Sequence, residues 1–576
     1  MIPRQPSPNE GPKALQRLAG LVTALALLAA LALPAQAQVV RGTLREAGSG
    51  APIEGAMVVL LGTDDAPVYQ VLTDASGRFF MERRSPGRYR LRADRIGHAS
   101  SYHPAFTLAE ADTVAVEMIA TVEAIQLEGI DVEGDTRCRV RPEEGLAVAT
   151  VWEEVRKALA AASWTGEHGV FRYDLTHLDR NLDRRAQRVE REDRRLERTS
   201  RQRTFISLPA GKLISEGFVV TDRDGTVFYG PDADVLLSDD FLETHCFRLR
   251  QGRRSNEGLL GLGFEPVGGR RLTEISGTLW LDPSTSELRL LEWRYVNLHP
   301  DLDNENLGGR VEFVALPSGP WIIRKWWIRM PLIGLDPRNR ANSGRQLVGI
   351  RETGAQVRRI AEATGRIVME FEGGAVQGTV RGGYQATPLS GAQVEIVGVP
   401  IEVRADRSGR FTAVGLEEGT YAVRFSHPSL DSLGFRAPDR LVEVPDQGVV
   451  ELELVAPTPF EIIAAQCSDE EMSAGTAALM GFLRREDTGE PATGATLRVT
   501  WARYDVPGQG VVRETASGVR AVPDERGFYL ACGVPTDTPL EVTVENGDRL
   551  PSTSLRIPAE EWRWYFDAAV PGAPVP

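Results

Sequence analysis

Cysteine is scarce in this chain, with four among 576 residues. None of them forms a Cys-x-x-Cys pair, so the sequence supports neither a thiol redox motif nor a zinc knuckle. If the chain is exported, an even number permits two disulfides. The positions favour Cys138–Cys246 and Cys467–Cys532, each inside one expected domain, and each bridge would contribute about 4 kcal/mol. Buried free thiols are the alternative.

Histidine is scarce as well. The seven histidines stand singly, and none is followed by Glu three residues later. A zinc peptidase needs two imidazoles and a carboxylate at one metal, so this class of site is unsupported. The sequence also has no G-x-S-x-G, no P-loop and no Rossmann glycine pattern. We therefore expect a non-catalytic protein without a metal or another cofactor.

Apolar runs long enough to cross a bilayer as a helix are missing after the N-terminus. The one long run, residues 18–35, follows Arg4, Lys13 and Arg17 and precedes a small-x-small motif at residues 35–37. This pattern predicts a signal peptide at residues 1–37 that is cleaved between Ala37 and Gln38. A retained N-terminal anchor is the alternative. Position 38 is not Cys, which argues against a lipoprotein.

Basic residues are outnumbered by acidic ones. Removal of residues 1–37 takes away three basic residues and one acidic residue and leaves a net charge of −16. This charge argues against nucleic acid as a partner and suits an exported, soluble surface. We expect the protein in the periplasm, on the outer-membrane surface or outside the cell. Membrane association without a transmembrane span stays open.

One spacing pattern occurs three times along the chain. Each copy has Gly, then Pro, then Gly-Ala, with the second glycine thirteen positions after the first, and later an Asp-x-x-Gly turn with an aromatic residue two positions on. β-Branched runs between these points predict strands, and short strands with frequent turns predict an antiparallel β-sandwich. The turn and aromatic residues are Asp74, Gly77 and Phe79; Asp406, Gly409 and Phe411; and Asp524, Gly527 and Tyr529.

The chemistry of these turns is local. The Asp side chain accepts from backbone N–H groups, and Gly supplies a positive φ. We expect the aromatic residue that follows in the core of the next strand. Calcium binding is the alternative, but the turn at residues 406–409 offers too few oxygen ligands. Gly-x-Tyr then opens another strand at residues 87–89 and 419–421, and we expect the tyrosine to be buried with its hydroxyl at the rim.

The whole pattern resembles the carboxypeptidase regulatory-like domain, a transthyretin-like or prealbumin-like sandwich. The first two copies match all four elements of that family's outline, and the third has "CGVPTDTPLEV" in place of Gly-x-Tyr. The resemblance covers about half of the chain. It implies a seven-stranded fold and a role as an accessory or carbohydrate-binding-like module, and it implies no catalysis.

Residues 138–370 do not follow the repeat. Pro142–Trp164 predicts an amphipathic helix, because its apolar residues fall on one face. Alternating strands and hairpin turns follow, so we expect one helix with an antiparallel meander or half-barrel. The run 183–203 carries charges of both signs, and we expect a solvated strand pair or helix face there. A patch for an anionic glycan or a phospholipid is the alternative.

Aromatic residues gather in the expected hairpins of this central segment. Aromatics in sheets are usually core residues. A half-barrel lined by tryptophan could instead hold a lipid tail or stack on sugars. The residues concerned are Trp280, Trp293, Tyr295, Trp321, Trp326 and Trp327.

The sequence therefore predicts a mainly β protein in which tandem prealbumin-like or Ig-like β-sandwiches flank a central α+β domain. The expected parts are a signal peptide (1–37), a sandwich (38–120), a linker (121–137), the central domain (138–370), a second sandwich (374–456) and a third, divergent sandwich (460–576).

The expected function is non-catalytic binding or scaffolding of an envelope protein or polysaccharide. A lipid or glycan carrier that uses the central half-barrel is one alternative. The other is an enzyme with an unrecognised site in residues 138–370, which would need Asp, Glu or His side chains converging in a deep cleft with shifted pKa values.

Overall fold

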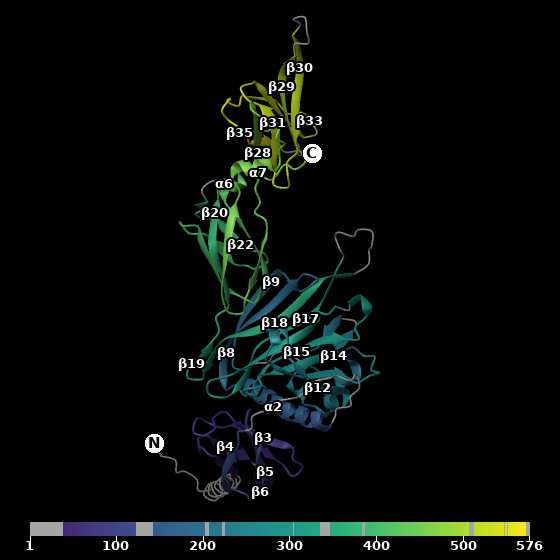
Figure 1. Cartoon of the computed structure of the whole chain (residues 1–576), viewed down its shortest axis with the longest axis vertical. Coiled ribbons are helices and arrows are strands. Elements are labelled where there is room, and N and C mark those ends of the chain that lie inside the picture. Colours follow the sequence, from purple (N-terminus) through teal and green to yellow (C-terminus); the bar gives the residue numbers. More distant parts are fainter. Residues whose placement is uncertain are drawn as a thin grey trace, which may run out of the picture. The chain divides into compact units, whose positions relative to one another are not determined.

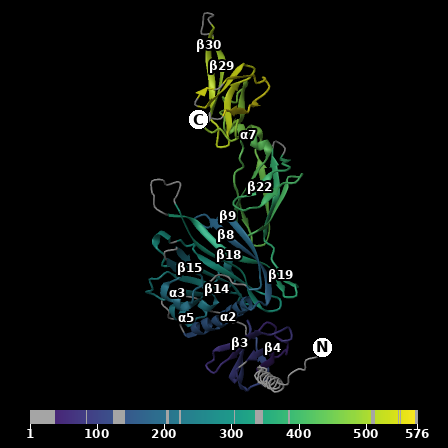
Figure 2. The ribbon, with the colours of Figure 1, turned by 180° about the vertical axis from the view of Figure 1, so that it is seen from behind.

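The computed structural model describes residues 38–571 except 84, 123–141, 202–206, 222–224, 303, 335–345, 383–385, 506–511, 547 and 550. The expected signal peptide and Cys138 lie outside the described residues. The described residues form mainly β structure (Figures 1 and 2). It divides into two compact units: unit 1 extends to His177 and includes Leu196–Met330 and Gly354–Glu370, and unit 2 comprises Leu178–Arg195, Pro331–Thr353 and the chain from Phe371. Among the described residues, no helix is long and apolar enough to span a membrane.

The first sandwich, in unit 1, has two sheets with strand orders β4-β1-β7 and β3-β2-β5-β6. Strand β1 pairs antiparallel with β4 and parallel with β7, so the first and last strands lie side by side. Alternating apolar residues of both sheets fill one core, which includes Val40, Leu60 and Leu91. The strands are β1 (Gln38–Glu46), β2 (Met57–Leu61), β3 (Pro67–Leu72), β4 (Arg78–Arg83), β5 (Gly87–Asp94), β6 (Ser101–Leu108) and β7 (Thr113–Ala120).

The second sandwich, in unit 2, repeats this topology. Strand β20 pairs antiparallel with β24 and parallel with β27, and the facing strands run in the order β23-β22-β25 with β26 beside β25. The elements are β20 (Gly374–Gly382), β21 (Thr387–Pro388), β22 (Gln393–Ile396), β23 (Glu402–Arg404), β24 (Arg410–Leu416), β25 (Gly419–Ser426), α6 (Pro428–Asp431), β26 (Arg440–Val444) and β27 (Gly448–Ala456).

The third sandwich, also in unit 2, keeps the topology although its sequence lacks Gly-x-Tyr. Strand β28 pairs antiparallel with β31 and parallel with β35 and β36, and β29 lies between β30 and β32 in the second sheet. The elements are α7 (Pro459–Ala464), β28 (Thr476–Arg485), β29 (Thr496–Asp505), β30 (Arg513–Ala521), β31 (Phe528–Pro535), β32 (Leu540–Asn546), β33 (Asp548–Arg549), β34 (Thr553–Leu555), β35 (Arg563–Tyr565) and β36 (Ala568–Val570).

One disulfide is present in the third sandwich, between Cys467 and Cys532. It joins the segment after α7 to β31, and the Cα atoms are 5.7 Å apart. The second expected bridge involves Cys138, which lies outside the described residues, so the pairing Cys138–Cys246 stays a prediction.

The central sheet follows the order β12-β13-β14-β15-β16-β17-β18-β8-β9, with β19 beside β18. The unit boundary crosses β8, β9, β17 and β18. Helix α2 (Pro142–Glu167) packs on β12, β13 and β15. The strands are β8 (Phe171–Leu182), β9 (Val189–Thr199), β12 (His245–Gln251), β13 (Leu260–Pro266), β14 (Glu274–Leu281), β15 (Leu288–Val296), β16 (Gly308–Ala315), β17 (Trp321–Gly334), β18 (Gln346–Glu362) and β19 (Ile367–Glu370). The expected fold class, sandwiches flanking a helix with an antiparallel meander, is confirmed.

Between β9 and β12 the chain forms short elements that the sequence did not predict. They are too short for a helical period to show, and two of them begin at side-chain caps. The Asp232 carboxylate accepts from Val235 N, and the Ser238 hydroxyl accepts from Phe241 N. The elements are α3 (Ala210–Glu216), β10 (Val219–Thr221), β11 (Thr226–Phe228), α4 (Ala233–Leu236) and α5 (Asp239–Thr244). Two 3₁₀ turns, η1 (Arg254–Asn256) and η2 (Pro300–Leu302), follow further on.

Candidate functional site

The three Asp-x-x-Gly turns use their oxygens internally. In each turn one carboxylate oxygen accepts from two backbone N–H groups, two and four residues on, at 2.8–3.0 Å. The glycines have φ values of 70°, 73° and 83°, and a Cβ there would clash with the carbonyl oxygens of Leu44, Val380 and Leu483. The following aromatic residue is buried in every copy. These bonds hold Asp74, Asp406 and Asp524 in a turn, and the described residues contain no acidic or His/Cys cluster suited to a metal.

The Gly-x-Tyr tyrosines differ between the first two sandwiches. The Tyr89 hydroxyl donates to the Ser85 carbonyl oxygen at 2.9 Å, a bond within its own domain. The Tyr421 hydroxyl lies 3.1 Å from the corresponding carbonyl, that of Glu417, and also contacts side chains of β8 and β9. The same motif position is therefore a corner in one sandwich and part of an attachment in the other.

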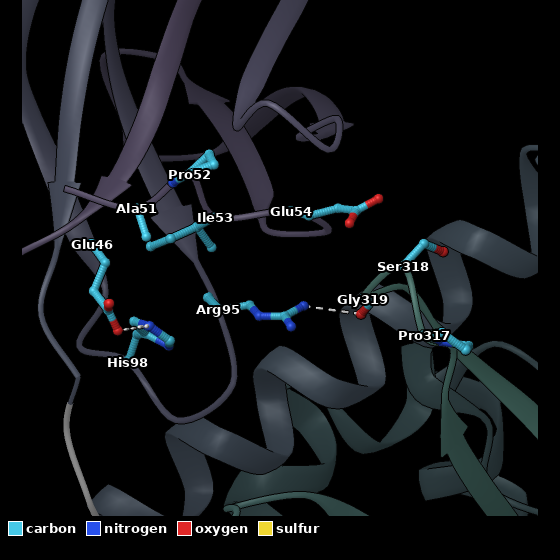
Figure 3. A pocket seen from close by; sticks show the side chains of 10 residues that line it. All are labelled: Glu46, Ala51, Pro52, Ile53, Glu54, Arg95, His98, Pro317, Ser318 and Gly319. Atoms are coloured by element: carbon cyan, nitrogen blue, oxygen red, sulfur yellow. Dashed lines mark hydrogen bonds and ion pairs between the residues drawn. The ribbon is translucent and has the colours of Figure 1, made fainter. Parts of the chain in front are cut away.

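The first sandwich is attached within unit 1 through two glycine turns (Figure 3). The Arg95 guanidinium donates to Gly319 O at 3.0 Å and to Gly55 O at 3.4 Å. Both glycines have positive φ, and a Cβ on Gly55 would lie 2.7 Å from the Gly319 carbonyl carbon. An open cavity of about 290 Å³ remains beside this contact, and Glu46 and His98 line it. Burial lowers the pKa of Arg95, although the Glu54 carboxylate opposes the shift.

Helix α2 makes the second half of this attachment with a buried ion pair. Lys157 Nζ lies 2.6 Å from Glu154 Oε1 and donates to His98 O at 2.7 Å. Glu154 Oε2 accepts from Gly97 N at 2.8 Å. A buried ion pair is stable only when its remaining donors and acceptors are satisfied. The backbone of residues 97–98 in the first sandwich satisfies this one, so the sandwich and the helix depend on each other.

A different buried cluster attaches the second sandwich within unit 2. We call Arg180, Glu192, Glu352 and Tyr421 the attachment cluster. Arg180 donates to Glu192 Oε2 at 2.6 Å, to Glu352 Oε1 at 3.3 Å and to the Tyr421 hydroxyl at 2.8 Å. The side chains of Arg180, Glu192 and Glu352 are at most 5% exposed. Burial raises the pKa of Tyr421, so its hydroxyl stays protonated.

Backbone contacts extend the attachment cluster along the same strands. Arg180 also donates to Glu418 O at 3.0 Å, and Glu192 N donates to Gly398 O at 2.7 Å. Arg194 donates both to Glu192 and to Gly415 O, the latter at 2.5 Å. The guanidinium of Arg180, on β8, thus has partners on β9 and β18 and on the second sandwich, and this arrangement offsets the cost of burying it.

Sequence reasoning missed this cluster because Glu192 and Arg194 lie in the run 183–203, which was expected to be solvated. Most of β9 is indeed exposed, but Val189 and Glu192 are buried. Because side chains alternate between the two faces of a strand, a strand at this position would have placed Glu192 and Arg194 on one face. Their partners in the second sandwich, Tyr421 and Gly415, are 229 and 221 residues away, so no local pattern indicates these contacts.

The aromatic residues of the central sheet pack on glycines of neighbouring strands. A Cβ on Gly261 would lie 2.7 Å from the Trp280 ring, and a Cβ on Gly309 would clash with Trp293. Trp280 Nε1 donates to Glu292 at 2.8 Å, and the Tyr295 hydroxyl donates to Tyr229 O at 3.0 Å. These rings and that of Trp321 are buried, whereas Trp326 and Trp327 are half-buried. The buried rings pack between strands, as expected for core residues.

One pair in the central domain has the shifted pKa values that the enzyme alternative requires. His245 Nε2 and Glu274 Oε2 are 3.9 Å apart, and neither atom has a hydrogen-bond partner in the described structure. Burial lowers the pKa of His245 to about 4 and raises that of Glu274. Both side chains are 0% exposed, and His245 stacks on Phe241. A substrate has no access to groups enclosed in this way, so the pair does not form a catalytic cleft.

Comparisons with known proteins bear on the sandwiches. No curated protein matches the chain. Similar solved structures include the shaft pilin SpaA from Lactobacillus rhamnosus GG, with 13% identity, a TM-score of 0.14 and coverage of 35% of this chain and 100% of that one. They also include BcpA, the major pilin subunit of Bacillus cereus, with 9% identity, a TM-score of 0.13 and coverage of 73% and 99%.

The family comparison identifies two segments. Residues 39–121 and 375–454 match the model of the carboxypeptidase regulatory-like domain, which confirms the resemblance for the first two copies of the repeat. The chain therefore contains two carboxypeptidase regulatory-like domains, and these are the first and second sandwiches.

Proposed function

We propose that this chain is a non-catalytic protein of the bacterial cell envelope whose β-sandwich domains bind a partner, which is a protein or a polysaccharide. The signal-peptide pattern of residues 1–37 and the acidic composition support export. The two regulatory-like domains support an accessory role rather than a catalytic one.

The observation that best supports the proposal is that each of the first two sandwiches is attached through buried charged groups. In unit 1 the Glu154–Lys157 pair is saturated by backbone groups of the first sandwich. In unit 2 Arg180 is saturated by two carboxylates, a hydroxyl and a carbonyl. Buried groups of this kind make it costly for a sandwich to swing away from its neighbour. Such stiffness is of use to a protein that presents binding surfaces, because it lowers the entropy lost on binding.

Cross-linking of the native protein in intact cells tests the proposal. The captured material is identified by mass spectrometry for proteins and by sugar analysis for polysaccharide. We expect one class to be recovered reproducibly from the surface fraction and to be absent from cells that lack the chain. Recovery of neither class above that background would contradict the proposal. N-terminal sequencing of the mature protein tests export directly, with Gln38 as the expected first residue.

A further inference from the structure

A groove of about 770 Å³ lies in unit 2, on the second sandwich and beside Arg526 of the third sandwich. Its floor is the outward face of β22 and β25, where Glu395 and Arg424 form a cross-strand pair with two bonds of 2.8 and 2.9 Å. One wall is the segment 399–402, and the other includes Asp431 of α6 and residues 435–437. This volume falls within the range of small-ligand sites.

The corresponding face of the first sandwich has no such surface. Strand β2 is buried on both faces, whereas β22 alternates between exposed and buried residues. Val59 stands opposite Arg92 in the register that Glu395 and Arg424 occupy in the second sandwich. The groove therefore depends on the outward face of the second sandwich and on Arg526 of the third, and it does not follow from the shared fold.

The polar groups along the groove are balanced in charge. Three carboxylates, of Glu395, Glu402 and Asp431, face three guanidinium groups, of Arg424, Arg436 and Arg526. The side chains of Asp431 and Arg436 form no hydrogen bond or ion pair within the part of the chain that the structure describes. A net charge near zero gives no electrostatic attraction for polyanions such as nucleic acids or acidic glycans.

Apolar surface lies between these charges. Phe435 and Ile401 are half-buried and line the groove together with Pro400. An extended peptide adds to a sheet through main-chain hydrogen bonds at an exposed edge. The floor of this groove is a sheet face with side-chain donors and acceptors, so it offers no ladder to a peptide. Carboxylate and guanidinium groups suit neighbouring hydroxyl groups, and a ring such as Phe435 suits the apolar face of a pyranose.

We propose that this groove binds a neutral oligosaccharide segment of an envelope polysaccharide. In this arrangement Asp431 accepts from hydroxyl groups, Arg436 donates to them, and Phe435 packs against the face of a sugar ring. The inference rests on the proposed function and deepens it, because it selects polysaccharide over protein as the partner of the second sandwich.

Binding of defined oligosaccharides to the full chain tests the inference. The probes are cello-, malto-, manno- and chito-hexaose, with tri-galacturonate as the acidic comparison, each titrated by isothermal calorimetry. We expect saturable binding of at least one neutral hexaose and weaker binding of the acidic probe. Arg436→Ala and Phe435→Ala should each weaken neutral binding at least tenfold, and Asp431→Asn, which keeps the side-chain shape, at least threefold.

Arg440→Ala is the matched control, since Arg440 is an exposed arginine of β26 in the same sandwich and does not line the groove. It should leave the affinity within twofold. The inference is wrong if no neutral hexaose binds, if the acidic probe binds more tightly, or if Arg440→Ala weakens binding as much as Arg436→Ala.

The in-cell capture separates this failure from failure of the proposed function. If Arg436→Ala chains still capture a protein partner while no oligosaccharide binds, the groove assignment is wrong and the scaffold proposal stands. If capture fails for the unaltered chain as well, the scaffold proposal itself is wrong.

Discussion

The first and second sandwiches share their topology and their turn motifs, yet each joins its unit through a different surface. The first uses the turn at Gly55 and the segment 94–98, which meet Gly319 and helix α2. The second uses Tyr421 and neighbouring loops, which meet Arg180 and Glu192. Where the first has Arg95, six residues after its tyrosine, the second has His427, which caps α6.

This difference separates residues that make the fold from residues that attach it. The turn aspartates, the glycines after them and the buried aromatics perform the same task in each copy. The attaching residues include motif positions, Gly55 and Tyr421, but their partners lie outside the motif and differ between copies. A sandwich of this type can therefore be placed in new surroundings by changing a few polar side chains while its core stays the same.

The largest expected difference concerns the two buried arginines. Arg180→Met removes a buried cationic partner from both Glu192 and Glu352, and removing one partner of a buried pair costs about 3–5 kcal/mol. Arg95→Met loses hydrogen bonds to carbonyl oxygens only and should cost about 1–2 kcal/mol. Native-state hydrogen exchange of peptides from β25 and β5 measures each effect locally.

Arg88→Met is the control for these substitutions, because Arg88 is an exposed arginine of β5. Its exchange rates should stay close to those of the unaltered chain. Equal losses of exchange protection for Arg180→Met and Arg95→Met would mean that the two attachments do not differ in strength.

A smaller difference is expected between the motif glycines Gly55 and Gly391. Both have positive φ, of 68° and 80°, so alanine costs each about 1–2 kcal/mol. At Gly55 the new Cβ also meets Gly319, whereas nothing lies within 4 Å at Gly391. Gly55→Ala should therefore destabilise its sandwich by about 2 kcal/mol more than Gly391→Ala, since the attachment must shift. Urea unfolding of the full chain, followed by hydrogen exchange in each sandwich, measures both effects. Equal destabilisation by the two substitutions would mean that the contact between Gly55 and Gly319 does not contribute to stability.

The two tyrosines give the next comparison. Tyr421→Phe removes a hydroxyl that contacts a buried guanidinium and a buried carboxylate, and charged partners make such bonds worth about 1.5–3 kcal/mol. Tyr89→Phe removes one neutral bond to Ser85 O and should cost about 1 kcal/mol. Exchange protection of β25 and β5 is again the measurement. A larger loss of exchange protection for Tyr89→Phe than for Tyr421→Phe would contradict the assignment of Tyr89 as a corner and of Tyr421 as part of the attachment.

The smallest effect is the acid sensitivity of one ion pair in the second sandwich, Glu395 with Arg424. The hydrogen bonds from Arg424 lower the pKa of Glu395, so this carboxylate stabilises the folded chain above its unfolded pKa of about 4.3, and the contribution disappears as pH falls through the folded value. The pair is exposed and is worth about 0.5 kcal/mol.

Glu395→Gln should therefore destabilise the second sandwich by this amount at pH 7 and by less at pH 3. Glu402→Gln, at an exposed glutamate of β23, is the matched control and should change neither value. Urea unfolding at the two pH values measures both variants. The first sandwich, with Val59 at the same register, should show no corresponding change, and a pH-independent effect of Glu395→Gln would argue against the ion pair.

The parts of the molecule that sequence predicts well are those made by neighbours in the chain. The Asp-x-x-Gly turns and the long helix depend on hydrogen bonds between residues close in the chain, and the spacing of the turns repeats three times. The third sandwich was found in this way although the family model does not match it.

The attachments and the groove depend on tertiary contacts that leave little trace in the sequence. Arg180 and Tyr421 are 241 residues apart, and β9 looked like a solvated charged run because only a few of its residues are buried. Asp431 and Arg436 lie in a segment without any motif. They line the same groove as Glu395 because of the course of α6 and of the loop after it.

The parallel pairing of first and last strands determines how each sandwich responds to a pull on its two ends. Strands β1 and β7 pair from Val39 with Thr113 to Glu46 with Ala120, and β20 and β27 pair from Gly374 with Gly448 to Gly382 with Ala456. A force applied through the entering and leaving chain then acts along these strands in shear. The hydrogen bonds between them share the load and must break together instead of opening one after another. The second sandwich, which has chain before β20 and after β27, can therefore carry tension along the chain.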